Sequence, residues 1–182
     1  MDVVARIGKA ASVFRRLQPI WSLRTINTGI KFQLYKSLVL STLLYACETW
    51  KNTSQIARKL EVFHRRCIRR ILQISWRDHV TNKDLMQRAE MDYICDIITR
   101  RRWKMAGHVM RRPEEIPARV AVTWIPKDGK RKRGRPRKTW RSTFAQDLSN
   151  MEMTWEDAMS EAQDRDWWRS LADRCFSGNG RS

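Results

Sequence analysis

A run of basic side chains near the middle of the chain is the feature whose chemistry is easiest to define. Residues 130–138 read KRKRGRPRK, and guanidinium and ammonium groups at this density attract phosphates without reading base sequence. Gly134 would let the backbone approach a groove floor, and Pro136 would keep the chain extended. The run predicts contact with nucleic acid through Lys130, Arg131, Lys132, Arg133, Gly134, Arg135, Pro136, Arg137 and Lys138.

The core of this run, Arg133-Gly-Arg-Pro-Arg, matches the AT-hook, a motif of small chromatin proteins. In such a motif Arg133 and Arg135 would lie along the narrow, negative minor groove of A·T-rich DNA. The motif is short, so two other interpretations stay open: a nuclear localisation signal and a basic linker that binds RNA. The run therefore predicts nucleic-acid contact in general, with A·T reading as one of the alternatives.

Two further groups of basic residues fall on predicted helices. An apolar stripe at helical spacing predicts the first of these helices: Ile56, Leu60, Phe63, Cys67 and Ile71. Off this stripe, with only Glu61 as an acidic neighbour, the helix has a cationic face made by Arg58, Lys59, Arg65, Arg66, Arg69 and Arg70. The second group lies on a helix expected over about 93–111 and comprises Arg100, Arg101, Arg102 and Lys104. The cations of the first helix have almost no acidic residues at i,i+4 that would neutralise them, so we expect them to contact phosphates. We expect phosphate contacts from the second group as well.

The overall charge supports a polyanionic partner. The chain has 182 residues, 42% of them hydrophobic, and a net charge of +18. Residues 100–141 contain 16 Lys and Arg against 3 Asp and Glu, whereas residues 142–182 contain 4 against 8. A packed core is thus expected together with a strong positive field, which favours RNA or DNA as partner. A membrane partner is not expected, because the most apolar run, Leu38–Cys47, is about half the ~20 residues of a bilayer span.

Metal binding has little support from the cysteines and histidines. The four cysteines are widely spaced and form no CxxC pair, so neither a disulfide scaffold nor a zinc finger is predicted. Cys67 lies on the apolar stripe, where a cysteine is ordinarily a small core residue. No metal or other cofactor is expected, although a composite zinc site built from His64, Cys67, Cys95 and His108 remains open.

Catalysis by the chain itself is not expected. Nucleotidyl transfer needs clustered carboxylates that hold two magnesium ions. The adjacent acidic pairs are Glu114-Glu115, in a proline-bracketed loop, and Glu156-Asp157, where helix capping explains them. No phosphate-binding GxxxxGK[ST] loop, GxSxG elbow or HExxH motif occurs, so no small-molecule substrate is predicted either.

The elements that must position these residues are predicted to be helices throughout, giving an all-α fold. Pattern and capping signals predict helices over 3–17, from 27 or 28 to about 50, from 53 or 54 to about 74, and over 83–91, 93–111, 139–148, 154–162 and 164–174. The apolar set of the second helix is expected to be Ile30, Leu34, Leu38 and Leu44. Residues 112–138 contain four prolines and are expected to form an extended, poorly ordered basic connector.

Five stretches in a fixed order give the chain a recognisable likeness. They are Leu43–Trp50, Phe63–Leu72, Trp76–Asn82, Arg102–Val109 and Gly134–Trp140. Together they resemble the C-terminal part of endonuclease–reverse transcriptases from LINE-type (non-LTR) retrotransposons, particularly RTE-like elements. The likeness covers nearly the whole chain. It implies a helical thumb that grips template and primer, followed by a basic tail that helps to hold element RNA and target DNA.

The resemblance also divides the chain and limits what it can do. It implies a thumb-like helical bundle over 1–76, a second helical group over 77–111, the basic connector over 112–138 and a small acidic helical end over 139–182. The aspartate pair of the polymerase palm and the endonuclease are both absent from this chain, so RNA-directed DNA polymerase activity is not carried over. The tryptophans within these motifs are expected mainly to pack helices, with stacking on bases as the alternative.

Two functional hypotheses follow. The first is a non-catalytic, nucleic-acid-binding fragment of a retrotransposon reverse transcriptase that grips RNA or DNA through phosphates. The second is a stand-alone chromatin-associated AT-hook protein whose helices form a partner-binding module. Either hypothesis predicts a nuclear location, with a cytoplasmic ribonucleoprotein as an alternative for the first, and the oligomeric state stays open.

Overall fold

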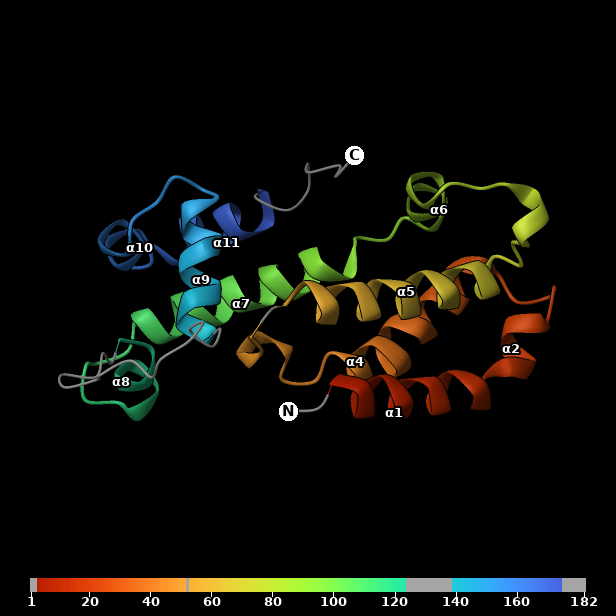
Figure 1. Ribbon diagram of the computed structural model, residues 1–182, viewed down its shortest axis with the longest axis horizontal. Coiled ribbons are helices and arrows are strands. Elements are labelled where there is room, and N and C mark those ends of the chain that lie inside the picture. The colour runs from red at the N-terminus through yellow and green to blue at the C-terminus, as the bar shows by residue number, and fades with distance from the viewer. Residues whose placement is uncertain (1–2, 52, 124–138, 175–182) are drawn as a thin grey trace. The chain divides into compact units, whose positions relative to one another are not determined.

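A computed structural model of the chain describes residues 3–51, 53–123 and 139–174 (Figure 1). Within these ranges every regular element is a helix and no strand is present, so the predicted all-α class is confirmed. The described residues form two compact units. The N-terminal unit comprises residues up to Cys47 and Ser54–Cys95, and the C-terminal unit comprises Glu48–Thr53 and residues from Asp96 onward. The finer division into four parts stays a prediction.

The N-terminal unit is built from helices whose ends follow the predicted ones closely, with one exception, and from one short helix over residues 18–22 that was not predicted. Its elements are α1 (Val3–Arg16), α2 (Gln18–Ser22), α3 (Thr28–Leu34), the π-helical segment η1 (Tyr35–Leu40), α4 (Ser41–Leu43), α5 (Ser54–Ile71), the short 3₁₀ turn η3 (Trp76–Asp78) and α6 (Asn82–Ala89). The exception is the second predicted helix, which ends at Leu43 instead of about Trp50. Ala46 adopts a left-handed backbone with φ of 57°, which no α-helix can continue through.

The buried face of this second helix differs from the expected one, although Leu44 of the predicted set is buried. Ile30 and Leu38 were predicted to face the core, but their exposed fractions are 52% and 42%. The core instead receives a parallel stripe formed by Phe32, Tyr35, Val39 and Leu43. Both stripes are apolar in the sequence, and the larger aromatic rings of the second bury more surface. The wider turns of η1 also shift the register of the side chains that follow it.

Helix α5 forms the centre of the N-terminal unit. It packs against α1, α2, α3 and α6. Its predicted apolar stripe is confirmed at Leu60, Cys67 and Ile71, which are buried, while Ile56 and Phe63 are partly buried. His64 is also buried on this face. Its Nδ1 lies 2.8 Å from the Tyr35 hydroxyl and its Nε2 lies 3.2 Å from the carbonyl oxygen of Asp92.

The burial of His64 makes the N-terminal unit sensitive to acid. In the neutral ring Nε2–H can donate to the Asp92 carbonyl oxygen while Nδ1 accepts from the Tyr35 hydroxyl, so both contacts are compatible with an uncharged imidazole. Burial lowers the pKa of His64 from 6.5 to about 4, and the positive charge of Arg65 acts in the same direction. The unfolded chain therefore binds a proton on this ring at a pH where the folded chain does not.

We expect the free energy of unfolding to fall by roughly 2 to 3 kcal/mol as the pH drops from about 6.5 to about 4. This stability is fully present above the unfolded pKa, and it is lost as the pH falls toward the folded one. Urea unfolding over this pH range measures it, and His64→Gln provides the control, because carboxylates titrate equally in both proteins. Identical pH slopes for the two proteins would contradict the assignment.

The C-terminal unit packs around tryptophans. It contains α7 (Ile94–Met110) from Asp96 onward, α8 (Pro117–Thr123), α9 (Trp140–Ser149), α10 (Trp155–Glu161) and α11 (Arg165–Arg174). Its core brings together Trp103, Ala106, Met110, Phe144, Leu148, Ala158, Ala162, Trp168 and Ala172. Capping boxes begin two of these helices, at Thr139 for α9 and at Thr154 for α10, and the second of them was predicted. The Glu48–Thr53 segment joins this unit because Trp140 Nε1 donates to the Glu48 carbonyl oxygen at 2.7 Å.

The expectation of an extended connector from residue 112 is wrong in its first part. Residues 117–123 form α8, which begins at a proline. Proline suits the first turn of a helix, because the amide proton that it lacks has no partner there. Arg119 holds the preceding loop by donating to the Arg112 carbonyl oxygen at 3.1 Å and pairing with Glu114 at 3.6 Å. Residues 124–138 lie outside the described residues.

No described helix is both long enough and apolar enough to cross a bilayer. The two longest, α5 and α7, contain clusters of Arg and Lys that interrupt any apolar run. The packing of each unit decides which of these basic side chains are exposed.

Candidate nucleic-acid interface

The cationic face of α5 is the most extended basic surface among the described residues of the N-terminal unit. Arg58, Lys59, Arg66 and Arg70 are all exposed, as the sequence predicted. They occur on the side of α5 that does not enter the core, because Leu60, Cys67 and Ile71 fill the opposite side. The amphipathic pattern of one helix thus presents four positive charges to solvent on one face, over a length of about three turns, or roughly 18 Å.

The two other predicted cations of this helix are already engaged with the protein. Arg69 Nη2 donates to the Val80 carbonyl oxygen at 2.9 Å and to Asn82 Oδ1 at 3.2 Å. Arg65 Nε donates to the Glu61 carbonyl oxygen at 3.2 Å. Both side chains are half-buried, so their first role is structural. Arg69 in particular fixes the segment before α6, and it adds its charge to the face without projecting freely from it.

A groove with an apolar floor adjoins this face, and the sequence did not predict it. Its volume is about 650 Å³, and it lies between α1 and α5. The groove is lined by Val4, Ile7, Gln55, Arg58, Lys59, Val62, Phe63 and Arg66. Val4 is 55% exposed there, because Val3, Ala10 and Phe14 are the residues that fill the core from α1. Three cations therefore border a surface on which flat or aliphatic groups could rest.

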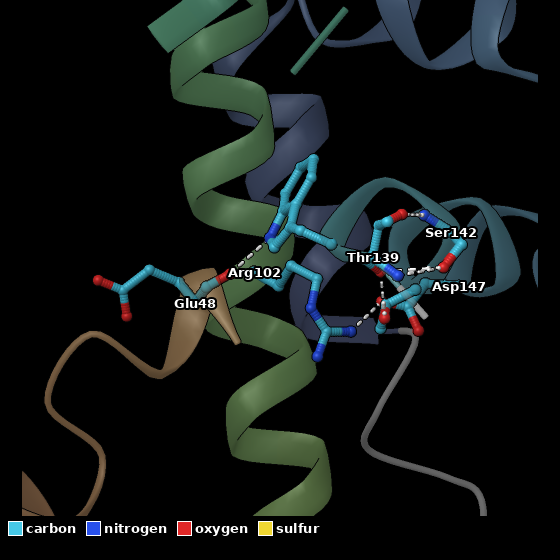
Figure 2. A network of polar contacts seen from close by, with 7 residues as sticks. Glu48, Arg102, Thr139, Ser142 and Asp147 are labelled. Atoms are coloured by element: carbon cyan, nitrogen blue, oxygen red, sulfur yellow. Dashed lines mark hydrogen bonds and ion pairs between the residues drawn. The ribbon is translucent and has the colours of Figure 1, made fainter. Parts of the chain in front are cut away.

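The basic group on α7 behaves differently from its prediction. Arg102 is fully buried, and its Nη1 donates to Asp147 Oδ2 on α9 (Figure 2). Burial raises the pKa of Asp147, and the Arg102 guanidinium opposes this shift. Figure 2 shows the Arg102 side chain directed toward α9, close to the Thr139–Ser142 capping box. The prediction that Arg102 contacts phosphate is therefore wrong, since its guanidinium is enclosed by the core of its own unit.

The remaining basic residues of this group lie nearer the surface. Arg101 is exposed, and Lys104 keeps 47% of its side-chain surface. Arg100 is partly buried and lies 3.5 Å from Asp173, which Lys104 also contacts at 3.0 Å. Successive helical residues are rotated by about 100°, so the three arginines face different environments. Only part of the predicted group thus reaches solvent with a positive charge to offer.

The Arg-rich run Lys130–Lys138, with its AT-hook-like core, lies outside the described residues. Of the predicted cations that the structure describes, the exposed ones are Arg58, Lys59, Arg66 and Arg70 on α5 and Arg101 and Lys104 on α7. Whether the run reads A·T pairs stays a prediction that a binding experiment must decide.

The two residues of the composite zinc site that lie on α5 are engaged in the core. His64 uses both ring nitrogens in the contacts to Tyr35 and Asp92. Burial raises the pKa of the Cys67 thiol to about 12, so the thiolate that zinc needs is not formed at neutral pH. Within the described ranges no three His, Cys, Asp or Glu side chains are grouped in a way that could hold a metal ion.

The tryptophans divide between packing and exposure. Trp50 and Trp103 are buried and Trp140 is partly buried, as expected for packing residues. Trp76 is different, because 78% of its surface is exposed in the turn η3 and only the Arg77 guanidinium lies over its ring, at 5.4 Å. An exposed indole beside an arginine is the combination on which unpaired bases stack. The stacking alternative therefore applies to Trp76 alone among the four tryptophans of the family-like motifs.

Comparison with known proteins finds similarity to a transposon-derived protein. No family model matches the chain, and no solved structure matches it. A Caenorhabditis elegans protein described as uncharacterized and transposon-derived is 24% identical over 157 residues, which is 80% of this chain and 54% of that protein. The chain thus spans about half the length of this relative. The similarity supports a transposon origin for the chain.

Proposed function

We propose that the chain is the thumb and basic tail of a non-LTR retrotransposon reverse transcriptase, and that it binds RNA or DNA chiefly through phosphates. In this proposal the chain performs no catalysis itself and acts in the nucleus. The observation that carries the proposal is the α5 face, where Arg58, Lys59, Arg66 and Arg70 are exposed together. The similarity to a transposon-derived protein is consistent with this origin.

The electrostatics of α5 favour a polyanion over a purely solvated surface. Four exposed cations on one helix repel one another, and α5 contains one acidic residue, Glu61. The Glu61 carboxylate faces inward, where its Oε1 accepts from the Cys95 amide at 3.1 Å. A phosphate backbone would relieve this repulsion and release its condensed counterions, which is the main source of sequence-independent affinity.

The surroundings of the face suit a strand with accessible bases. The groove between α1 and α5 offers an apolar floor behind Arg58, Lys59 and Arg66. The exposed Trp76 ring, in the same unit, offers a stacking surface. Phosphate contacts with nearby stacking or apolar surfaces bind single strands without strong sequence preference.

Removing three cations of the face should weaken binding and flatten its salt dependence. For Arg58→Gln/Lys59→Gln/Arg66→Gln we expect at least about a tenfold loss of affinity at low salt. The slope of log K against log salt should become shallower by about three, one for each lost phosphate contact. Fluorescence anisotropy with hairpin RNA, A·T-rich duplex and G·C-rich duplex measures both quantities.

The matched control removes the same charge from α1. Lys9, Arg15 and Arg16 are exposed, so Lys9→Gln/Arg15→Gln/Arg16→Gln has the same net charge as the α5 variant. Equal losses in the two variants would show that only net charge matters and would refute a defined α5 interface. A preference for the A·T duplex that disappears in Arg133→Ala/Arg135→Ala would instead favour the AT-hook function.

A further inference from the structure

A second group of cations gathers around a pocket in the C-terminal unit. The pocket has a volume of about 410 Å³ and is lined by Lys104, His108, Arg111, Arg165, Trp168 and Arg169. The lining residues of α7 and of the turn directly after it recur at i, i+4 and i+7, and those of α11 at i, i+3 and i+4, so each segment turns one face toward the pocket. Only Lys104 belongs to the basic residues that the sequence predicted.

The pocket exists because α7 and α11 approach closely at a glycine. A Cβ atom at Gly107 would lie 2.2 Å from Nε1 of Trp168, so no larger residue fits beside this ring. Trp168 is 2% exposed, and its Nε1 donates to the Trp103 carbonyl oxygen at 2.7 Å. The indole is thereby locked between the helices, which fixes the spacing of the cations on either side of it.

The cations of the pocket are only partly neutralised. Lys104 lies 3.0 Å from Asp173, and Arg169 lies 3.3 Å from Asp166, whose side chain is 88% exposed. Arg111 donates from Nη1 to the Ala162 carbonyl oxygen at 2.7 Å, a contact that orients its guanidinium without neutralising it. Arg165 forms no ion pair with any residue that the structure describes. Four permanent cations thus share two carboxylates, one of which Arg100 also contacts.

The mutual repulsion of these groups is visible in one of them. Burial lowers the pKa of Arg111, and the charges of Arg165 and Arg169 lower it further. His108 adds another polar group, and its Nε2 lies 3.2 Å from Nη2 of Arg112. Such a concentration of guanidinium groups needs an anion, and the planar, multiply donating fork of arginine matches phosphate oxygens.

We propose that the pocket between α7 and α11 binds the phosphate groups of a nucleic-acid strand, through Lys104, Arg111, Arg165 and Arg169. Its volume accommodates one or two adjacent phosphates. The proposal rests on the proposed function in one respect, namely that the phosphate belongs to a nucleic acid. The pocket residues themselves are identified independently, because none of them lies on α5. It extends the interface to a unit in which the sequence predicted phosphate contacts only from the basic group of α7 and from the Arg-rich run.

His108 provides a direct readout of the pocket in the full-length protein. The chain has three histidines, so the imidazole signals of His108 in an NMR spectrum are assigned by comparison with His108→Gln. Titration with inorganic pyrophosphate should shift these signals saturably. A single-stranded RNA oligonucleotide should then displace pyrophosphate and produce its own shift at the same signals.

The test variant is Arg165→Gln/Arg169→Gln, since both side chains are exposed and neither supports the core. We expect about a tenfold weaker response to pyrophosphate and to RNA, because two charge-assisted contacts are lost. The control Lys9→Gln/Arg16→Gln removes the same charge from α1 and should respond like the wild type. A wild-type His108 that does not move with either ligand would overturn the proposal, as would an equal response in both variants.

The two proposals fail in distinguishable ways. If His108 stays silent while the α5 triple variant still loses RNA affinity, the pocket proposal fails and the proposed function stands. If His108 responds to both ligands while the α5 variant binds RNA normally, the pocket stands and the α5 interface fails. A response to pyrophosphate that RNA cannot displace would identify a small phosphate compound as ligand and would overturn the nucleic-acid assignment.

Discussion

Asp147→Ala should lower the free energy of unfolding of the C-terminal unit by about 3 to 5 kcal/mol. Arg102 has no exposed surface, and Nη1 of its guanidinium pairs with the Asp147 carboxylate. Its Nε and Nη2 atoms have no hydrogen-bond partner among the described residues. Without Asp147 the guanidinium would stay buried with an uncompensated charge, because no other described carboxylate lies within 4 Å of it. Urea unfolding followed by tryptophan fluorescence measures this loss, since Trp103 and Trp168 lie in the core of the unit, and Trp21→Phe removes the signal of the buried tryptophan of the N-terminal unit.

A double variant separates two contributions to stability: the destabilisation by a buried, unpaired charge and the stabilisation by the ion pair itself. Arg102→Met/Asp147→Leu removes both charges and keeps apolar volume, and we expect its stability to lie much nearer the wild type than that of Asp147→Ala. Replacing a buried ion pair by packed apolar side chains is often neutral or stabilising, since two charges no longer need desolvation. If the double variant proved as unstable as the single one, the loss would come from packing, and the account of Arg102 as a stranded charge would be wrong.

The positions of most helices could be predicted because their signals are local. Thr154 and Asp157 form the predicted capping box, and α5 begins at Ser54, directly after Thr53, which is one of its two predicted N-cap residues. The end of the second helix was predicted too late, at about Trp50 instead of Leu43, for the opposite reason. Nothing local distinguishes Leu44 and Tyr45 from helical residues, and the turn depends on the left-handed backbone at Ala46. Boundaries set by capping residues were therefore predictable, whereas those set by tertiary packing were not.

The same distinction between local signals and tertiary contacts explains which residues of the candidate sites could be predicted. The exposed cations Arg58, Lys59 and Arg66 follow from the amphipathic pattern of one helix, so the sequence alone located them. Arg102 could not be separated from Arg101 in this way, because its partner Asp147 lies 45 residues further along the chain. The pocket of α7 and α11 was also missed, since it depends on a contact between Trp168 and Trp103 across 65 residues.

Gly107→Ala should destabilise the C-terminal unit by about 3 kcal/mol or more, at the upper end of overpacking effects. The added Cβ would lie 2.2 Å from Nε1 and 2.3 Å from Cδ1 of Trp168, well inside van der Waals contact. The ring cannot move aside cheaply, because it is 2% exposed and its Nε1 is bonded to the Trp103 carbonyl oxygen. The Trp103 ring, stacked on it with centroids 5.0 Å apart, closes the other side. Loss of tryptophan fluorescence at lower urea would measure the effect, and the response of His108 to pyrophosphate should weaken with it.

Gly8→Ala is the matched control for this substitution. A Cβ atom at Gly8 would meet nothing within 4 Å, and Gly8 lies inside α1, where alanine is the better helix former. We expect this change to stabilise the chain by about 0.4 to 1 kcal/mol. A second comparison uses Trp168→Leu, which removes the ring that the new methyl group would strike. Gly107→Ala should therefore lower the free energy of unfolding less in the Trp168→Leu protein than in the wild type. If Gly107→Ala unfolded at the same urea concentration as Gly8→Ala, the close contact of α7 and α11 at Trp168 would not exist in solution, and neither would the pocket that it positions.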